Sequence, residues 1–282
     1  MLTTASEEMI IVTMSAKITH SHAVFEKSSM PATAITGSEF GHLEEATLQA
    51  AKWILKNFPS EERLLLVADA SVREERFYKD LAREAGFKVN TFLKNPPSSF
   101  HGAVLAVHVN GNDIFNIPHR GATAVAVTPW GVEKDPEDGH PINTSGLQPW
   151  AVGTSATVIG GQPIDWRNSY VVGNKGAPQV LTPLPAEAVE RLDRLSMTIN
   201  LANPFSSYYE KRDIVGTLMG IRDYYGSIDP LALEAWSWSQ DWPNRRRQEF
   251  KELAQAVKDY KKLQANRKPI KPIPFNPHNP KD

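Results

Sequence analysis

An acidic loop contains side chains that could bind a metal ion. The segment KDPEDGHPIN carries Asp135, Asp138 and His140, whose carboxylate and imidazole groups are common cation ligands. Their spacing matches no established metal motif, and Asp-Pro and Asp-Gly pairs are typical of solvent-exposed turns. An exposed turn is therefore the stronger interpretation of these residues.

A second segment, HVNGND at His108–Asp113, follows an apolar strand and could approach a phosphate. Ligands of Rossmann-like sheets gather at the carboxyl ends of the strands, where this segment would lie. The chain contains neither G-x-G-x-x-G nor a P-loop motif, which disfavours a conventional dinucleotide or P-loop site. A plain turn is the competing interpretation. His119 and Arg120, just before the next predicted strand, are as compatible with a loop role as with a ligand role.

Other motifs for chemistry are missing from the sequence. There is no G-x-S-x-G elbow and no H-E-x-x-H, and the absence of cysteine excludes disulfides, thiolate zinc sites and cysteine nucleophiles. Lys and Arg number 31 against 32 acidic residues, so net charge does not draw the chain to nucleic acid or an anionic membrane. No apolar run reaches membrane-spanning length, and Glu7 and Glu8 stand where a signal peptide needs basic residues. We therefore expect a cytoplasmic protein with no membrane segment.

The elements that must position these groups form an α/β domain over residues 1–180. Three short β-rich runs come first, and we expect them to be antiparallel neighbours joined by tight turns. Helices then alternate with strands, which favours a mixed, mostly parallel sheet of the ribonuclease H-like or Rossmann-like kind. The predicted strands are 9–15, 22–27, 32–36, 64–68, 87–93, 103–109 and 122–128, and the predicted helices are 41–58 and 72–85. Residues 131–180 are rich in turn-forming residues and predict loops with an edge hairpin.

A helical domain is predicted over residues 181–265, followed by a Pro-rich flexible tail at 266–282. Its helices are expected at 186–202, 212–225, 230–239 and 244–265. Within it Trp236, Trp238 and Trp242 lie next to the basic run 245–247. These groups could stack on nucleic acid or form a partner surface. A small core filled by tryptophan, with solvated arginines beside it, is the stronger interpretation.

The arrangement over about residues 9–95 resembles the ribonuclease H-like fold superfamily. VADAS, at 67–71, is similar to the end of that family's fourth strand, with Asp69 at the acidic position. HLEEATLQAAKWIL is similar to its first helix, and Glu44 rather than Glu45 leads the apolar row, so we expect Glu44 to point at the sheet. The resemblance implies that Glu44 and Asp69 are catalytic and metal-binding residues, which would hold Mg²⁺ or Mn²⁺ at a scissile phosphate.

The first strand departs from the family's pattern. Thr13 and Met14 stand where the family has its first metal-bridging Asp, and neither side chain replaces a carboxylate as a ligand of a hard cation. Each retained carboxylate also has an ordinary explanation. Asp69 suits a helix N-cap after a strand, and Glu44 suits the first turn of a helix, where the helix dipole favours an acid.

Three functions are compatible with these patterns. The preferred one is a ribonuclease H-like protein with an incomplete carboxylate set, which binds nucleic acid or a protein partner without catalysis. The second is an active divalent-metal nuclease that takes its missing ligands from Asp113, Asp135 or Asp138. The third is a Rossmann-like protein that binds a small ligand, such as a nucleotide, with the loops after Val109 and Thr128.

Overall fold

The computed structural model describes residues 30–37, 40, 42–94, 96–130, 132–134, 141–143, 146–160, 181–198, 208–259, 264–265 and 268–278. The strands predicted at 9–15 and 22–27 lie outside the described residues, as do Asp135, Asp138 and His140. No helix in the described ranges is long and apolar enough to span a membrane.

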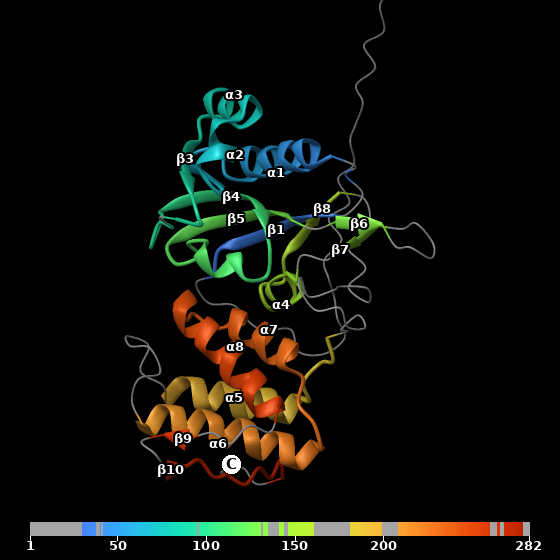
Figure 1. Ribbon diagram of the computed structural model, residues 1–282, viewed down its shortest axis with the longest axis vertical. Helices are drawn as coiled ribbons and strands as arrows, with labels where there is room; N and C mark the ends of the chain where they lie inside the picture. Colours follow the sequence, from blue (N-terminus) through green and yellow to red (C-terminus); the bar gives the residue numbers. More distant parts are fainter. Residues whose placement is uncertain are drawn as a thin grey trace, which may run out of the picture.

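Six parallel strands form the centre of the α/β part (Figure 1). They are β1 (Ala32–Thr36), β2 (Arg63–Val67), β3 (Lys88–Thr91), β4 (Gly102–Val109), β5 (Ala122–Pro129) and β8 (Thr157–Ile159). The order across the sheet is β3-β2-β4-β5-β1-β8. The predicted fold class, a largely parallel α/β sheet with a helical C-terminal part, is confirmed.

The position of β1 differs from the prediction of antiparallel neighbours. This strand pairs in parallel with β5 on one side and with β8 on the other. Four of its five residues are buried, which suits a strand covered on both faces inside a parallel sheet. Its partners are therefore strands that are distant in the sequence.

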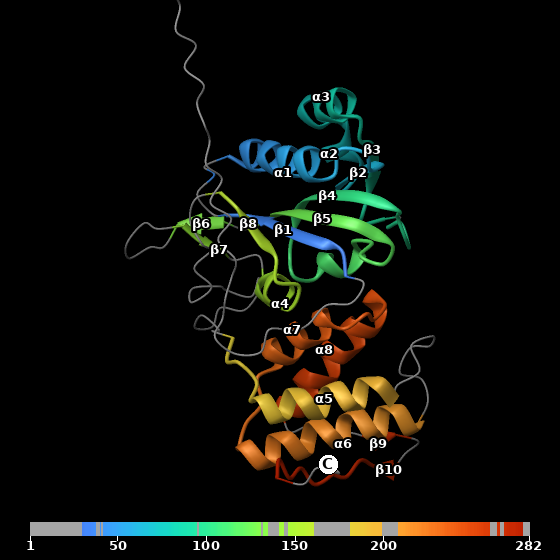
Figure 2. The same ribbon diagram turned by 180° about the vertical axis from the view of Figure 1, so that it is seen from behind.

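Helices cover the two faces of the sheet according to the direction in which the chain crosses it. The chain runs from β1 to β3 toward one edge, with α1 (Leu43–Asn57), α2 (Ala70–Glu74) and α3 (Arg76–Ala85) between the strands. It runs from β4 to β8 toward the other edge, with the 3₁₀ turn η1 (Asp113–Asn116) and α4 (Gln148–Gly153). Right-handed crossovers place these two groups on opposite faces, as Figures 1 and 2 show.

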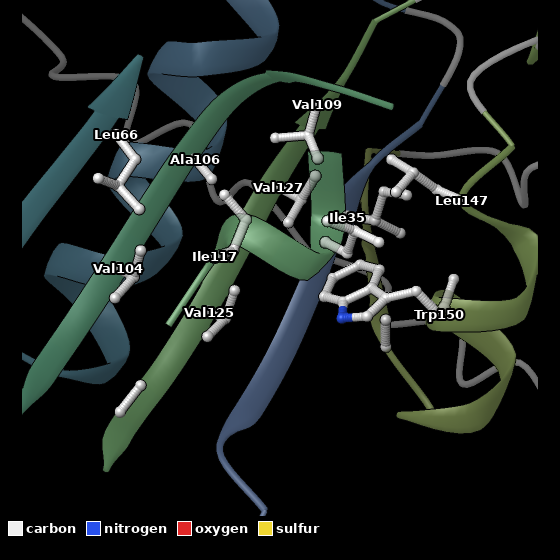
Figure 3. Packing of buried hydrophobic residues seen from close by; sticks show 14 of the residues in the cluster. Ile35, Leu66, Val104, Ala106, Val109, Ile117, Val125, Val127, Leu147 and Trp150 are labelled. Atoms are coloured by element: carbon white, nitrogen blue, oxygen red, sulfur yellow. The ribbon is translucent and has the colours of Figure 1, made fainter. Parts of the chain in front are cut away.

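The core alternates between the two faces along each strand. In β2, Leu64 and Leu66 join the cluster on the η1 and α4 side, whereas Leu65 and Val67 join the cluster under α1 and α3. Figure 3 shows Trp150 of α4 directed at the sheet beside Ile35. The predicted strand 64–68, with the continuously apolar sequence LLLVA, is thus buried on both faces, as such a sequence favours.

Helix α1 packs with a face other than the predicted one. Its buried residues are Ala46, Thr47, Ala50, Ala51 and Ile54. Leu48, which belongs to the apolar row led by Glu44 that was predicted to face the sheet, is 39% exposed, and Glu44 and Glu45 are both exposed. The small side chains of the buried face let the helix backbone lie close to the strands, and this close packing outweighs burial of the larger leucine.

The segment between β5 and β8 contains more structure than the predicted loops. A hairpin forms at β6 (Val132–Lys134) and β7 (Pro141–Asn143), but it is a sheet of its own rather than the predicted edge hairpin. The edge of the main sheet is instead the single strand β8, which is parallel with β1. Helix α4 was not predicted, because six residues are too few to display a helical period.

Four longer helices form the C-terminal part: α5 (Ala186–Thr198), α6 (Tyr208–Tyr225), α7 (Pro230–Ser239) and α8 (Asn244–Lys258). Asp229 caps α7 by accepting a hydrogen bond from the Leu231 amide at 2.9 Å, with Pro230 in the first turn. Trp236, Trp238 and Trp242 are all buried, which confirms the core interpretation. Buried rings cannot stack on nucleic acid.

Two of the three arginines beside these tryptophans are buried, contrary to the expected solvated run. Arg246 and Arg247 are 1% and 2% exposed. Arg247 donates to the carbonyl oxygens of Ser237 and Gln240, at the end of α7, and its guanidinium lies 4.6 Å from the centre of the Trp238 ring. The guanidinium therefore satisfies carbonyls that the helix leaves open at its C-terminus.

The helical part has a hydrophobic core of its own, and it also contributes an apolar side chain to the core of the sheet. Trp238 of α7 belongs to the cluster that also contains Ile35 and Trp150. Gly153 of α4 lies so close to α7 that an added Cβ would collide with the carbonyl of Ala235. The predicted boundary near residue 180 therefore separates segments of sequence that pack together in the fold.

Part of the predicted flexible tail is packed. The tail contains the short strand β10 (Lys268–Pro269), which pairs antiparallel with β9 (Gln264–Ala265) just before the tail. Ile270 is buried, and the Ile273 amide donates to the carbonyl of Gly216 in α6 at 2.9 Å. Gly216 and Gly220 leave the space that this segment occupies. Its many prolines prevent a helix but not docking on one.

Candidate functional site

The chain leaves neighbouring strands in opposite directions at one point of the sheet. β2 continues into α2 on one face, whereas its neighbour β4 continues into η1 on the other. Ligands of open parallel sheets bind at such a switch point, outside the carboxyl ends of the strands. The carboxyl ends of β2, β4 and β5 place Asp69, His108–Asp113 and Trp130 at this edge, which we call the carboxyl edge.

His108 occupies an irregular position in β4. The register with β5 shifts between Val107 and Val109, and His108 between them has a left-handed backbone with φ of 61°. That conformation costs a residue other than glycine about 1 kcal/mol or more. The bulge turns the imidazole toward α3, where its Nε2 lies 2.8 Å from the hydroxyl oxygen of Tyr78.

The other side of the imidazole contacts an exposed aromatic ring. The ring centres of His108 and Trp130 are 5.2 Å apart, with the planes inclined by 40°. Trp130 is 52% exposed, although its amide is held by the carbonyl of Val109 at 2.8 Å. A hydrogen-bonded backbone thus presents half of an indole ring to solvent beside the imidazole of His108.

Both polar groups of this cluster are held in their uncharged forms. Burial lowers the pKa of His108 below its usual value of 6.5. Burial, with smaller contributions from the negative charges of Glu75 and Glu44, raises the pKa of Tyr78 to about 12. At neutral pH the pair is a phenol bonded to a neutral imidazole. It is suited to hydrogen bonding rather than to charge attraction.

Asp69 caps α2. Its Oδ1 accepts hydrogen bonds from the amides of Ser71 and Val72, at 2.8 and 3.2 Å, and also from the Ser71 hydroxyl. These bonds, with the Ser71 hydroxyl contributing most, lower the pKa of Asp69, so it is ionised at neutral pH. The ordinary explanation of Asp69 as an N-cap is confirmed.

Glu44 lies at the start of α1, which follows the carboxyl end of β1. Its charge acts on Tyr78, so it is near the aromatic cluster, but its side chain is exposed rather than directed at the sheet. Within the described part of the chain, no group of three or more His, Asp or Glu side chains is placed to hold a metal ion. The metal-binding role of Glu44 and Asp69 stays a prediction.

The loop after β4 forms a closed turn. Asn110 Oδ1 accepts from the amides of Asn112 and Asp113, at 2.8 and 3.0 Å, and its Nδ2 donates to Asp113. Gly111 packs against the backbone of Gly146 with no room for a Cβ. Burial raises the pKa of Asp113 above its usual range. The amides expected to approach a phosphate are thus already bonded to the loop's own side chain.

His119 and Arg120 lie away from this edge, just before β5. Burial, with a contribution from the charge of Arg247, lowers the pKa of His119 to about 3. Its Nδ1 bonds to the carbonyl of Ile117 at 2.9 Å, and its Nε2 accepts from Trp150 Nε1 at 2.8 Å. A cavity of about 250 Å³ opens there, lined by His119, Arg120, Asp241 and Arg247. Because both ring nitrogens are occupied, His119 has a structural role.

Sequence reasoning missed two residues of the cluster. Tyr78, which falls within the predicted helix 72–85, and Trp130 were not singled out as candidate residues. The available signal for Trp130 was a large aromatic residue directly after a predicted strand. No local signal connects Tyr78 with His108, which is 30 residues away.

Comparisons with known proteins concern the helical part. Residues 186–272 match the family described as Domain of unknown function (DUF1889). The chain matches no curated protein and no solved structure. The family match covers α5 to β10 and does not include the carboxyl edge of the sheet.

Proposed function

We propose that the α/β part binds a small ligand with a planar ring at the carboxyl edge, over the loops that follow Val109 and Thr128. The observation that carries this proposal is the Tyr78–His108–Trp130 cluster at the switch point between β2 and β4. A ring that stacks on Trp130 would lie beside the imidazole of His108, and stacking of this kind contributes about 1–3 kcal/mol.

Two features support a binding role over a purely structural one. The strained backbone of His108 has to be compensated by the surrounding fold, and such strain is concentrated at functional sites. Trp130 is an exposed large hydrophobic residue, yet its backbone is hydrogen-bonded to the neighbouring strand. An ordered, half-exposed indole is a ready surface for another ring.

Hydrogen exchange in the full chain tests the proposal. The protein is measured alone and with a panel of planar-ring compounds: nucleosides, nucleotides and aromatic amines. We expect a binding compound to slow exchange at residues 108–113 and 128–130. Trp130→Ala should abolish this protection, whereas Met197→Ala, which removes an 83% exposed side chain on α5, should leave it intact.

If the ligand still slows hydrogen exchange in Trp130→Ala, the ligand does not bind on Trp130 at this edge. If no compound of the panel protects either loop, the proposed function is wrong. The melting temperature of Trp130→Ala without ligand should match that of the wild type within about 2 °C, because surface changes alter stability by about 0.5 kcal/mol or less.

The ribonuclease H-like function remains a second proposal, with or without catalysis. It is supported by the placement of Asp69 at the carboxyl end of β2 and by Glu44 near the same edge. Cleavage of a labelled RNA/DNA hybrid with Mg²⁺ or Mn²⁺, beside Asp69→Asn, tests its catalytic form. Asparagine is an equally good N-cap, so loss of cutting in this variant would report lost metal binding rather than unfolding. If the wild type does not cleave the hybrid, the catalytic form of this second proposal is wrong and only its binding form remains.

A further inference from the structure

At the switch point between β2 and β4, the two described turns lack the free backbone amides that commonly bind a phosphate in α/β proteins. Phosphate groups are usually held by unpaired N–H groups at the start of the helix that follows a strand. Here the amides of Ser71 and Val72 bond to Asp69, and those of Asn112 and Asp113 bond to Asn110. Both turns at the switch point are therefore closed by their own side chains.

The charges around this edge also oppose a phosphate. Asp69 is ionised, and the charges of Glu44 and Glu75 both act on Tyr78. The neighbouring bases are engaged: Lys79 and Arg73 pair with Glu74, at 2.6 and 3.3 Å. Lys94 also lowers the pKa of Asp69, so the acids Asp69, Glu44, Glu75 and Glu74 stand against three bases, and the charge of these named groups is −1. A phosphate dianion would meet repulsion where a neutral ligand would not.

The same carboxylates are suited to hydroxyl groups. Asp69 uses Oδ1 for its local hydrogen bonds and Asp113 uses Oδ2. Among the described residues, the second oxygen of each carboxylate has no hydrogen-bond partner. An ionised carboxylate accepts from a sugar hydroxyl, as it does in dinucleotide sites that hold a ribose.

The distance between these groups matches a ring joined to a sugar. Asp69 ends β2 and Trp130 follows β5, and β4 lies between the two strands. Neighbouring strands are about 4.8 Å apart, so the two positions are separated by about 10 Å across the sheet. That span is close to the length of a nucleoside, with its base on Trp130 and its sugar toward Asp69.

We infer that the ligand of the carboxyl edge is a nucleoside rather than a nucleotide: its base stacks on Trp130 beside His108, and its sugar hydroxyls bond to Asp69. This inference rests on the proposed function, because it names the ligand class of the same site. It corrects the expectation that the loop after β4 approaches a phosphate.

Paired titrations test the inference. Adenosine, guanosine and cytidine are each compared with their 5′-monophosphates against the full chain, by calorimetry and by quenching of tryptophan fluorescence. We expect each nucleoside that binds to bind at least about tenfold more tightly than its monophosphate, and Trp130→Ala to lose binding of both.

A variant with one acid fewer shows whether the phosphate is excluded by charge repulsion or by the shape of the site. Glu44→Gln removes one exposed acid near the cluster without changing its size. If charge excludes the phosphate, this variant should narrow the difference between nucleoside and monophosphate by about twofold to fivefold. Asp69→Asn, which retains the cap, should weaken the nucleoside as well, because the acceptor for its hydroxyl is lost.

The outcomes distinguish this inference from the proposed function. Monophosphates that bind as tightly as the nucleosides, or more tightly, would overturn the inference and leave ring binding at this edge in place. Binding of other planar-ring compounds without any nucleoside would do the same. If no ring compound binds, the proposed function and the inference fail together.

Discussion

Two histidines at opposite ends of neighbouring strands show how differently this fold uses the same side chain. His108 lies at the carboxyl end of β4, in a left-handed backbone, with one nitrogen bonded to Tyr78 and its ring against a half-exposed tryptophan. His119 lies before β5, 2% exposed, with both nitrogens bonded inside the protein. Burial lowers the pKa of both.

The partners of His119 fix its state. An indole N–H can only donate and a carbonyl can only accept, so His119 must carry its proton on Nδ1 and accept at Nε2. A protonated ring would lose the bond from Trp150. Low pKa alone therefore does not identify a functional group, and the histidine with strain and an exposed neighbour is the better candidate.

The largest effect is expected from removing His119. His119→Ala leaves a cavity and a buried Trp150 N–H without an acceptor, and we expect it to lower the free energy of unfolding by about 4 kcal/mol. Urea unfolding measures this loss. A cost below about 1 kcal/mol would contradict the structural role. His108→Ala is the matched control, because it removes the same side chain from a half-buried position.

A buried ion pair lies where helices α7 and α8 meet the loop after β4. Lys251 of α8 lies 3.1 Å from Glu234 of α7, whose side chain is 3% exposed, and it also reaches the carbonyl of Gly111 at 3.4 Å. Lys251→Met would leave the buried glutamate without its paired cation, so we expect the free energy of unfolding, measured in urea, to fall by about 3 kcal/mol. The double variant with Glu234→Gln should recover part of it. Equal stability of Lys251→Met and the wild type would show that the pair is not needed.

The pH dependence of the free energy of unfolding should report on the protonation of His119. His119 has a pKa of about 3 in the folded chain and 6.5 as its ordinary value, so between these pH values the unfolded state binds more protons. Stability contributed by the neutral ring is complete above pH 6.5 and falls by up to about 1.4 kcal/mol per pH unit as the pH decreases. His119→Gln should have a shallower loss between pH 6.5 and 4 than the wild type. Parallel curves would mean that His119 is not the group that titrates.

The smallest effect on stability is expected from His108→Asn. Asparagine tolerates the left-handed backbone, so we expect a change in unfolding free energy of less than about 1 kcal/mol. Ligand protection of residues 108–113 should nevertheless disappear with the ring. A variant that loses stability but retains protection would reverse the comparison between the two histidines.

The elements of this fold could be predicted from local patterns more easily than the site. The strands at β2, β4 and β5 and the helix at α7 were found because apolar runs, caps and prolines are local signals. The prediction of which face of α1 is buried was wrong, because alanines rather than the larger Leu48 contact the sheet. The prediction of the candidate site was incomplete, because the site combines residues from three separate elements: Tyr78, His108 and Trp130.

The sequence by itself determined the alternation of strands and helices, the two-sided burial of β2 and the cap formed by Asp69, because each depends on neighbours within a few residues. Only the tertiary structure decided that β1 lies between β5 and β8, that Arg246 and Arg247 are buried, and that an imidazole joins a phenol to an exposed indole. These features depend on strand order and on the packing of distant segments, which local patterns of residues do not encode.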